Sequence, residues 1–201
     1  MPDLVTIGET MVVLNPVFRG PLSSVSMFRR SIGGAESNVA IAAARLGISA
    51  GWISRLGDDE MGRYVLKTIR GEGVDTRHVM LDSDARTGVF FKELRGNQEP
   101  YVYYYRAGSA ASKMRPEDLD PSYFSSARVL YVSGITPALS KSCCETVFAA
   151  LEIAREYSVT VAFDPNIRLK LWTPDEARRI LLAIARQSDM LFPGLDEARM
   201  L

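Results

Sequence analysis

Short apolar segments alternate with helical segments along most of this chain, and this alternation restricts its fold more than any other feature. The apolar segments are candidate strands at 4–8, 50–54, 129–133, 160–164 and 189–192. The candidate helices between them cover 35–46, 63–72, 140–157 and 174–185. Apolar strands without polar alternation are typical of parallel sheets covered on both faces, and parallel neighbours need crossover helices. The sequence therefore predicts an α/β fold with a doubly wound, mostly parallel sheet.

Two stretches interrupt this alternation. Short candidate strands lie at 11–14 and 25–30, in a polar stretch that contains glycine and proline. Residues 89–94 and 101–106 flank the turn Gly96-Asn97 and have the pattern of an aromatic β-hairpin. We expect these strands to pair as a small separate sheet over one edge of the main one.

The interrupting segments predict one core with an inserted lid. The core would occupy 1–201, and segments 12–31 and 88–107 would form a β-lid spliced into it. Strand alternation places Tyr104 and Arg106 on one face of the lid and the neighbouring tyrosines on the other. One face can close over a sugar-like ligand, although an aromatic β-surface is the commoner cause of such a run. The other face favours a homodimer or higher homo-oligomer formed through the lid.

Charge and cysteine usage exclude several classes of partner. Lys and Arg together number 24, as do Asp and Glu, so no basic field is available for a nucleic acid. Cys143 and Cys144 are adjacent in a candidate helix, which favours neither a disulfide nor a metal site and suits a reducing compartment. No segment approaches the roughly 20 apolar residues that span a bilayer, and Met1-Pro2-Asp3 leads directly into an apolar strand. We therefore expect a cytoplasmic chain with small-molecule partners and no membrane association.

The glycine pair Gly33-Gly34 opens an alanine-rich helix. A ligand can approach a backbone without Cβ atoms closely, and the first amides of a helix have no intrahelical partner. Asn38 lies one turn further along and can face the same ligand. This pattern indicates a polar small-molecule site at a helix N-terminus, but a glycine turn before a buried helix explains the same residues equally well.

Polar or glycine-containing turns lie at or near several predicted strand ends. They are at 8–9, 33–34, 133–135, 164–168 and 193–194. In an open parallel sheet, ligands bind beyond the carboxyl ends of the strands. The convergence of these turns therefore predicts a ligand site along that edge of the sheet.

Two residues near these turns are candidates for binding charged groups. Arg168 can grip a carboxylate or phosphate through paired hydrogen bonds, and a salt bridge with Asp164 is the alternative. Glu197 can hold a hydrated Mg²⁺, although taken alone a solvated helix residue is the simpler interpretation. We expect His78 to be structural and the acidic segment 58–60 to start a helix.

The chain resembles the ribokinase-like (pfkB) carbohydrate kinases. Residues 33–47 and 57–62 are similar to the first signature of that family, and 71–75 lies where the family places such a segment. Three further pieces resemble 2-keto-3-deoxygluconate kinases in particular. They are 104–110, 133–140, and 164–168 followed by Leu171-Trp172. The resemblance covers essentially the whole chain and implies a ribokinase-like fold that takes ATP, Mg²⁺ and a small sugar acid.

The resemblance also implies a set of substrate-binding residues. They are Gly33, Gly34, Asn38, Phe90, Tyr104, Arg106 and Arg168. Arg106 would reach from the lid toward the substrate carboxylate, and Arg168 would bridge substrate and phosphate. Phe90 stands where related enzymes often carry a lid tyrosine, which removes one hydrogen bond to the substrate.

On the nucleotide side, the resemblance implies that Asn166, Arg168 and Gly194 contact the cofactor and that Glu197 belongs to the Mg²⁺ environment. Gly194 occupies a place where many family members have asparagine or serine. A larger departure concerns the second family signature, a Gly-Ala-Gly-Asp turn that supplies the general base. No Gly-x-Gly-Asp turn occurs in the sequence, so we identify no catalytic base and expect it beyond Leu201, with the last third of the family's length absent.

The activity implied by the resemblance is transfer of the γ-phosphoryl group of ATP to the primary hydroxyl of 2-keto-3-deoxygluconate. Without the base, we expect a protein ending at Leu201 to bind poorly and not to turn over. Alternatives are a kinase for fructose, ribose or a nucleoside, and a non-catalytic sugar-binding module. A dinucleotide-dependent dehydrogenase is more distant, because residues 8–10 lack the glycine fingerprint after the first strand.

Overall fold

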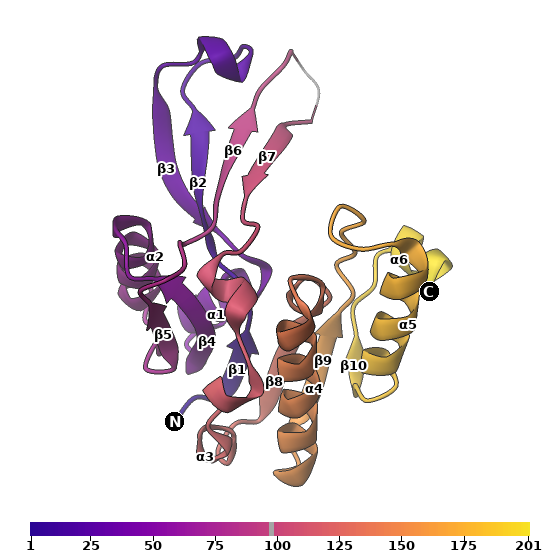
Figure 1. Cartoon of the computed structure of the whole chain (residues 1–201). Helices are drawn as coiled ribbons and strands as arrows, with labels where there is room; N and C mark the ends of the chain where they lie inside the picture. Colours follow the sequence, from indigo (N-terminus) through magenta and orange to yellow (C-terminus); the bar gives the residue numbers. More distant parts are fainter. Residues whose placement is uncertain (97–98) are drawn as a thin grey trace.

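A computed structural model of the chain describes residues 1–96 and 99–201. Asn97, part of the predicted hairpin turn, lies outside the described residues. Two sheets form the framework (Figure 1). The larger has six strands in the order β10-β9-β8-β1-β4-β5. Its strands are β1 (Leu4–Ile7), β4 (Ala50–Gly57), β5 (Val79–Asp82), β8 (Val129–Ser133), β9 (Thr160–Asp164) and β10 (Met190–Leu191). Each pairing described between them is parallel, which confirms the predicted parallel sheet.

Helices cover both faces of this sheet, as the doubly wound prediction requires. They are α1 (Ala35–Arg45), α2 (Glu60–Gly71), α3 (Pro121–Phe124), α4 (Lys141–Glu156), α5 (Pro174–Ala185) and α6 (Leu195–Met200). Neighbouring residues of β4 separate the two cores: Trp52 packs with α1 and α2, and Ile53 packs with α4 and α5 in the other cluster. Among the helices of the described residues, none is long and apolar enough to cross a bilayer.

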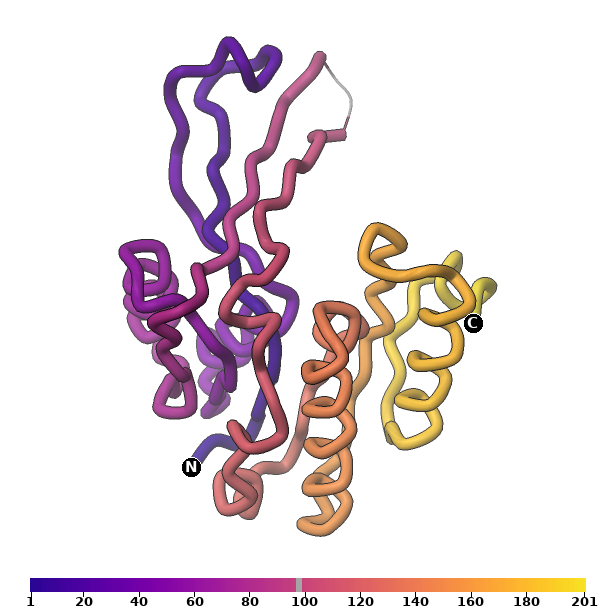
Figure 2. The backbone as a smooth tube through the Cα atoms, viewed as in Figure 1, coloured from indigo at the N-terminus to yellow at the C-terminus, as the bar shows by residue number. Residues whose placement is uncertain are grey.

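The second sheet has four strands in the order β3-β2-β6-β7 and extends away from the first (Figures 1 and 2). Its strands are β2 (Met11–Pro16), β3 (Phe28–Gly33), β6 (Val89–Glu93) and β7 (Tyr101–Tyr105). The central β2–β6 pair is parallel, and the two outer pairs are antiparallel. Its strands come from two stretches of sequence far apart in the chain, and both leave and re-enter the larger sheet.

The predicted strand at 25–30 is displaced. The observed strand starts at Phe28 because residues 22–24 form a 3₁₀ turn, and it continues to Gly33, which pairs with Met11. The prediction ended the strand at Arg30, whereas pairing with β2 continues it through Ser31 and Ile32 to Gly33. The result is that β3 runs directly into the N-terminus of α1.

The strand order positions a site at the carboxyl ends of β1 and β8. From β1 the chain proceeds to β4 through α1 on one face, whereas α4 connects β8 to β9 on the other. Such a reversal leaves a crevice beyond the strand ends. The helix start fits this crevice tightly, since a Cβ on Gly34 would lie 2.4 Å from the carbonyl oxygen of Glu9.

Candidate functional site

A cleft of about 390 Å³ lies between the second sheet and the carboxyl ends of β1, β8 and β9. Every residue predicted to bind the sugar acid lines it, and so does one further residue, which was predicted for the nucleotide side alone. The sugar-acid set is Gly33, Gly34, Asn38, Phe90, Tyr104, Arg106 and Arg168, and the additional residue is Asn166. The structure thus brings together residues separated by more than a hundred positions in the chain, while their individual roles stay predictions.

One wall of the cleft is the start of α1. Gly34 is the N-cap and has extended backbone, and its carbonyl oxygen accepts the first helical hydrogen bond from Asn38 N at 3.0 Å. Ser37 and Thr10 join their hydroxyls at 2.7 Å beneath this turn. Asn38 is exposed and forms part of the cleft lining. The hydrogen bond between Thr10 and Ser37 thereby joins the start of α1 to the residue that precedes β2. The backbone at Gly34 and the side-chain amide of Asn38 are available to a ligand.

The opposite wall comes from the hairpin β6–β7. Phe90 stands directly across from Tyr104, with ring centroids 5.4 Å apart. The Arg106 guanidinium lies 5.7 Å from the Tyr104 ring centroid, on the same face. Tyr105 instead packs edge-on against Phe91 at 5.6 Å on the other face. The predicted alternation of the hairpin side chains is confirmed.

A buried cluster around Arg106 was not anticipated from the sequence. Arg106 forms an ion pair with Glu9, whose side chain is 1% exposed, and Glu9 also lines the cleft. Ser109 Oγ donates to Glu9 Oε1 at 2.6 Å. The signal available in the sequence was Glu9 itself, an acidic residue that directly follows the first predicted strand, in the turn at 8–9.

A second unanticipated cluster surrounds Glu36, which is fully buried in the first turn of α1. Ser133, the last residue of β8, and Thr136, in the 3₁₀ turn that follows, donate hydrogen bonds of 2.6 and 2.7 Å to its Oε1. Loss of hydration on burial raises the pKa of Glu36. The cluster ties the start of α1 to the turn after β8. The signal available in the sequence for this cluster was Glu36 itself, an acidic residue in an alanine-rich helix.

The loop after β9 approaches the cleft from the other side. Asn166 has a positive φ of 38°, and its backbone N donates to Asp164 Oδ1 at 3.0 Å. Burial raises the pKa of Asp164. Arg168 is exposed, and among the described residues it forms no ion pair with Asp164; its Nη1 donates to the carbonyl of Ile167 at 3.1 Å. Its guanidinium is therefore available at the mouth of the cleft.

Glu197 holds this loop in place. Its Oε1 accepts from Ile167 N at 2.6 Å, and its Oε2 accepts from the N-cap residue Gly194 at 2.9 Å. No group of three or more His, Cys, Asp or Glu side chains in the described part of the chain is arranged to hold a metal ion. These residues do not form a metal site by themselves, and the roles of Glu197 and Gly194 beside Mg²⁺ and nucleotide stay predictions.

A larger cavity of about 1200 Å³ adjoins the cleft. Its walls are β7, the turn at 106–108, residues 138–139 and the loop 167–171. Tyr104, Arg106 and Arg168 line both spaces. A ligand in the cleft and a second ligand in the larger cavity would therefore meet at these side chains.

The residues predicted to be structural have structural contacts. The His78 ring packs on Tyr123 with centroids 3.9 Å apart. Asp59 caps α2 by accepting from Gly62 N at 2.7 Å, and it also accepts from Thr87 N at 2.9 Å. The Asp59 contacts join the start of α2 to the segment that leads into β6, whereas the His78–Tyr123 contact joins the start of β5 to α3. None of these residues lines the cleft.

Comparison with known proteins gives consistent matches over the whole chain. The family described as pfkB family carbohydrate kinase matches residues 1–201. A 2-dehydro-3-deoxygluconokinase from Bacillus subtilis (strain 168) is 38% identical over 202 residues, covering 99% of this chain and 62% of that protein. A 2-dehydro-3-deoxygalactonokinase from Haloferax volcanii is 41% identical over 195 residues, covering 96% of this chain and 59% of that protein.

Among solved structures, a PfkB protein from Polaromonas sp. JS666 matches with a TM-score of 0.96 and 40% identity, covering 100% of this chain and 68% of that one. The fold expectation is confirmed by this match. The chain spans about three fifths of the length of the curated relatives it matches, 62% and 59% in the two cases.

Proposed function

The chain belongs to the pfkB family of carbohydrate kinases, and from this premise we propose that it phosphorylates an acidic sugar with ATP. The first candidate substrate is 2-keto-3-deoxygluconate, also called 2-dehydro-3-deoxygluconate. The observation that carries this proposal is the single cleft of about 390 Å³ in which a helix start, an aromatic hairpin and two guanidinium groups converge.

The cleft suits a ligand with hydroxyls at one end and negative charge at the other. Gly33, Gly34 and Asn38 offer backbone and amide groups to hydroxyls. Arg106 lies across the cleft on the hairpin side, and a guanidinium is well suited to a carboxylate. A neutral sugar has little use for this group, which favours a sugar acid over fructose or ribose.

The phosphoryl donor would meet the sugar at Arg168. This side chain lines both the cleft and the larger cavity, so it can neutralise charge on a phosphate that lies between them. ATP supplies the phosphoryl group, together with a Mg²⁺ ion that neutralises its charge. The residues of this chain bind and orient the sugar and exclude water, and no general base was identified among them.

The second sheet acts as a lid in this proposal. Tyr101, Tyr103 and Tyr105 are between 39% and 66% exposed, although strands of this length usually bury one face. A second copy of the chain, packed lid against lid, would cover these rings. A monomeric mass by light scattering at assay concentration would argue against this assembly.

A coupled ADP-release assay tests the activity. Purified protein would be offered MgATP with 2-keto-3-deoxygluconate, its galacto epimer, fructose, ribose or adenosine, and sugar binding would be measured in parallel by calorimetry. Turnover or binding of the keto acids alone supports the proposal. Preference for fructose or ribose, or equal binding of all sugars, contradicts it. Binding of the keto acid without turnover supports the specificity for an acidic sugar and leaves phosphoryl transfer unsupported, as expected for a chain in which no general base is identified.

The galacto epimer is a specific second candidate. The relative from Haloferax volcanii named for that substrate is 41% identical, compared with 38% for the relative from Bacillus subtilis named for the gluco form. The ratio of kcat/KM for the two epimers, measured in the same assay, decides between them.

A further inference from the structure

Glu9, Arg106 and Ser109 meet where the second sheet joins the first. Glu9 lies between β1 and β2, Arg106 directly follows β7, and Ser109 caps the 3₁₀ turn at 110–113. The Glu9 and Arg106 side chains are 1% and 11% exposed, and both residues line the cleft. The proposed function gives Arg106 a role but leaves this buried acid without one.

The pairing of these side chains is incomplete. Glu9 Oε2 forms the ion pair with Arg106 Nη2, while Glu9 Oε1 accepts the Ser109 hydroxyl at 2.6 Å. Arg106 Nε, Arg106 Nη2 and Glu9 Oε2 are all buried and have no hydrogen-bond partner within residues 1–96 and 99–201, so Glu9 contacts the guanidinium as an ion pair without an aligned hydrogen bond. A carboxylate and a guanidinium commonly join through two parallel hydrogen bonds. Here Glu9 Oε1 instead accepts the Ser109 hydroxyl, and this hydrogen bond fixes the orientation of the carboxylate.

An unpaired buried N–H is unfavourable, and a ligand oxygen that reaches it recovers the lost hydrogen bond. A carboxylate recovers more than a hydroxyl does, because hydrogen bonds between two charged groups are the stronger kind. The half-paired state of Arg106 therefore favours a charged acceptor in the cleft. If Glu9 accepted hydrogen bonds from both Arg106 Nε and Arg106 Nη2, this preference for a charged ligand would be lost.

We propose that Glu9, restrained by Ser109, is a positioning residue that keeps Arg106 half-paired and thereby makes the cleft select a carboxylate-bearing sugar. This inference rests on the proposed role of Arg106 in acid recognition. Removal of the Ser109 hydroxyl leaves Glu9 Oε1 without its donor, and the adjacent unpaired donor is Arg106 Nε. In Ser109→Ala, Glu9 therefore pairs with Arg106 through both oxygens.

The first measurement needs no ligand. The ¹H–¹⁵N signal of Arg106 Nε–H, assigned with Arg106→Lys, is compared in wild type and Ser109→Ala. We expect it to shift in Ser109→Ala as Nε gains an acceptor, and to return in Ser109→Thr, which restores a hydroxyl. Ser112→Ala is the matched control, because the Ser112 hydroxyl donates to the carbonyl of Ser109 at 2.7 Å rather than to Glu9. An unchanged signal in Ser109→Ala overturns the proposal.

The second measurement is calorimetric binding of 2-keto-3-deoxygluconate and of its uncharged methyl ester. Ser109→Ala should weaken binding of the acid about tenfold, the value of one hydrogen bond to a charged group. Binding of the ester should not change, and Ser109→Thr should restore the affinity for the acid. Equal loss for acid and ester indicates a merely structural role and overturns the proposal. If wild type binds no sugar acid, the proposed function fails, and the Nε–H signal still decides whether Ser109 and Glu9 hold Arg106.

Discussion

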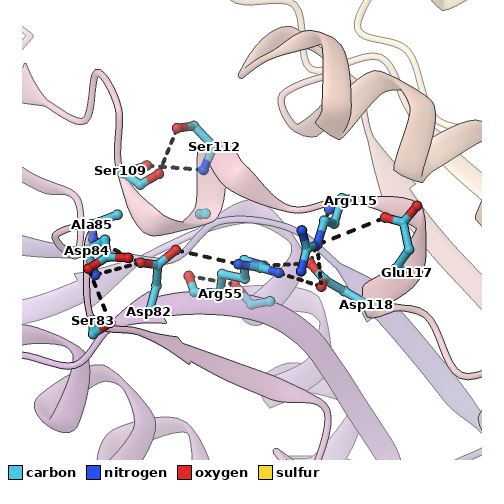
Figure 3. Close-up of polar contacts among 12 residues, drawn as sticks. Arg55, Asp82, Ser83, Asp84, Ala85, Ser109, Ser112, Arg115, Glu117 and Asp118 are labelled. Carbon is cyan, nitrogen blue, oxygen red and sulfur yellow. Dashed lines mark hydrogen bonds and ion pairs between the residues drawn. The ribbon is translucent and has the colours of Figure 1, made fainter.

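Two largely enclosed arginines, Arg55 and Arg106, differ in how completely they are paired. Arg55, on β4, forms two hydrogen bonds of 2.6 Å with Asp118 and a longer contact of 3.5 Å with Asp82 (Figure 3). Arg106 forms an ion pair with Glu9, but its buried Nε and Nη2 have no hydrogen-bond partner among the described residues. The side chains are similarly enclosed, at 13% and 11% exposure.

The difference separates a structural arginine from a binding arginine. Arg55 joins the carboxyl end of β4 to the turn at 116–118, and two acids take up its charge. Arg106 lines a cleft and keeps donor capacity unused. Burial and charge alone therefore do not identify a binding residue; the unused hydrogen-bond capacity does.

The largest effect is expected from Arg55→Leu. This change removes the cation that Asp118 and Asp82 share and leaves Asp118 only a longer ion pair with Arg115, at 3.7 Å. Breaking a buried pair costs up to about 3–5 kcal/mol of folding free energy. Urea denaturation of wild type and variant measures the loss. The selectivity between sugar acid and methyl ester should stay as in wild type wherever the variant is folded, and a changed selectivity would remove the distinction between the two arginines.

Arg106→Leu should act mainly on ligand binding. We expect KM for 2-keto-3-deoxygluconate to rise roughly 10- to 100-fold through loss of a charged hydrogen bond, and KM for fructose to change far less. Steady-state kinetics, or calorimetry if turnover is absent, gives the comparison. The variant also leaves Glu9 buried and unpaired, so adding Glu9→Gln should recover stability without recovering acid binding. Parallel losses for both sugars would show that Arg106 does not read the acid.

Glu36 sharpens the comparison because, like Arg106, it has a buried polar atom, its Oε2, without a hydrogen-bond partner among the described residues. Burial raises its pKa above the model-peptide value of 4.5, so the folded state holds the proton more tightly than the unfolded state. The resulting stability is present below about pH 4.5 and is lost as pH rises through the folded pKa. Glu36→Gln keeps the acceptor for Ser133 and Thr136 and carries no charge. Relative to wild type, it should become progressively more stable between pH 4 and pH 8 in thermal denaturation, and a constant difference would mean that Glu36 is charged.

The smallest effect is expected from Arg45→Ala. Arg45 forms two bonds of 2.7 Å with Glu72, a pairing as complete as that of Arg55, but its side chain is 66% exposed. Water screens such a pair. The urea midpoint should match that of wild type within experimental error. A clear loss of stability would show that completeness of pairing, rather than burial, determines the contribution.

The sequence predicted the larger sheet well because each of its strands is a local apolar run. The strands at 129–133 and 160–164 have the predicted bounds. The second sheet was harder to delimit, since its bounds depend on pairing between distant segments. The register Met11 to Gly33 extends β3 beyond the predicted strand, and nothing local in a glycine indicates that partner.

The cleft lining was predictable for residues that belong to recognisable motifs, such as Gly34, Tyr104 and Arg168. Glu9 and Ser109 were missed as partners because they lie 100 positions apart and meet only through the fold. Ser133 and Glu36, 97 positions apart, were missed for the same reason. Hydrogen-bond partners across a sheet edge follow from topology, which a single sequence specifies only indirectly.

The contact between Gly8 and Glu36 also constrains the order in which substitutions can accumulate at these two positions. A Cβ on Gly8 would stand 2.2 Å from Glu36 Cδ, so any side chain at position 8 collides with the carboxyl group. Glu36 does not move aside freely, because Ser133 and Thr136 hold its carboxyl group. A shorter residue at position 36 removes the obstacle, so the two sites are epistatic. A library that mutates position 8 alone should therefore return mostly glycine, and one that also shortens position 36 should accept more residues at position 8.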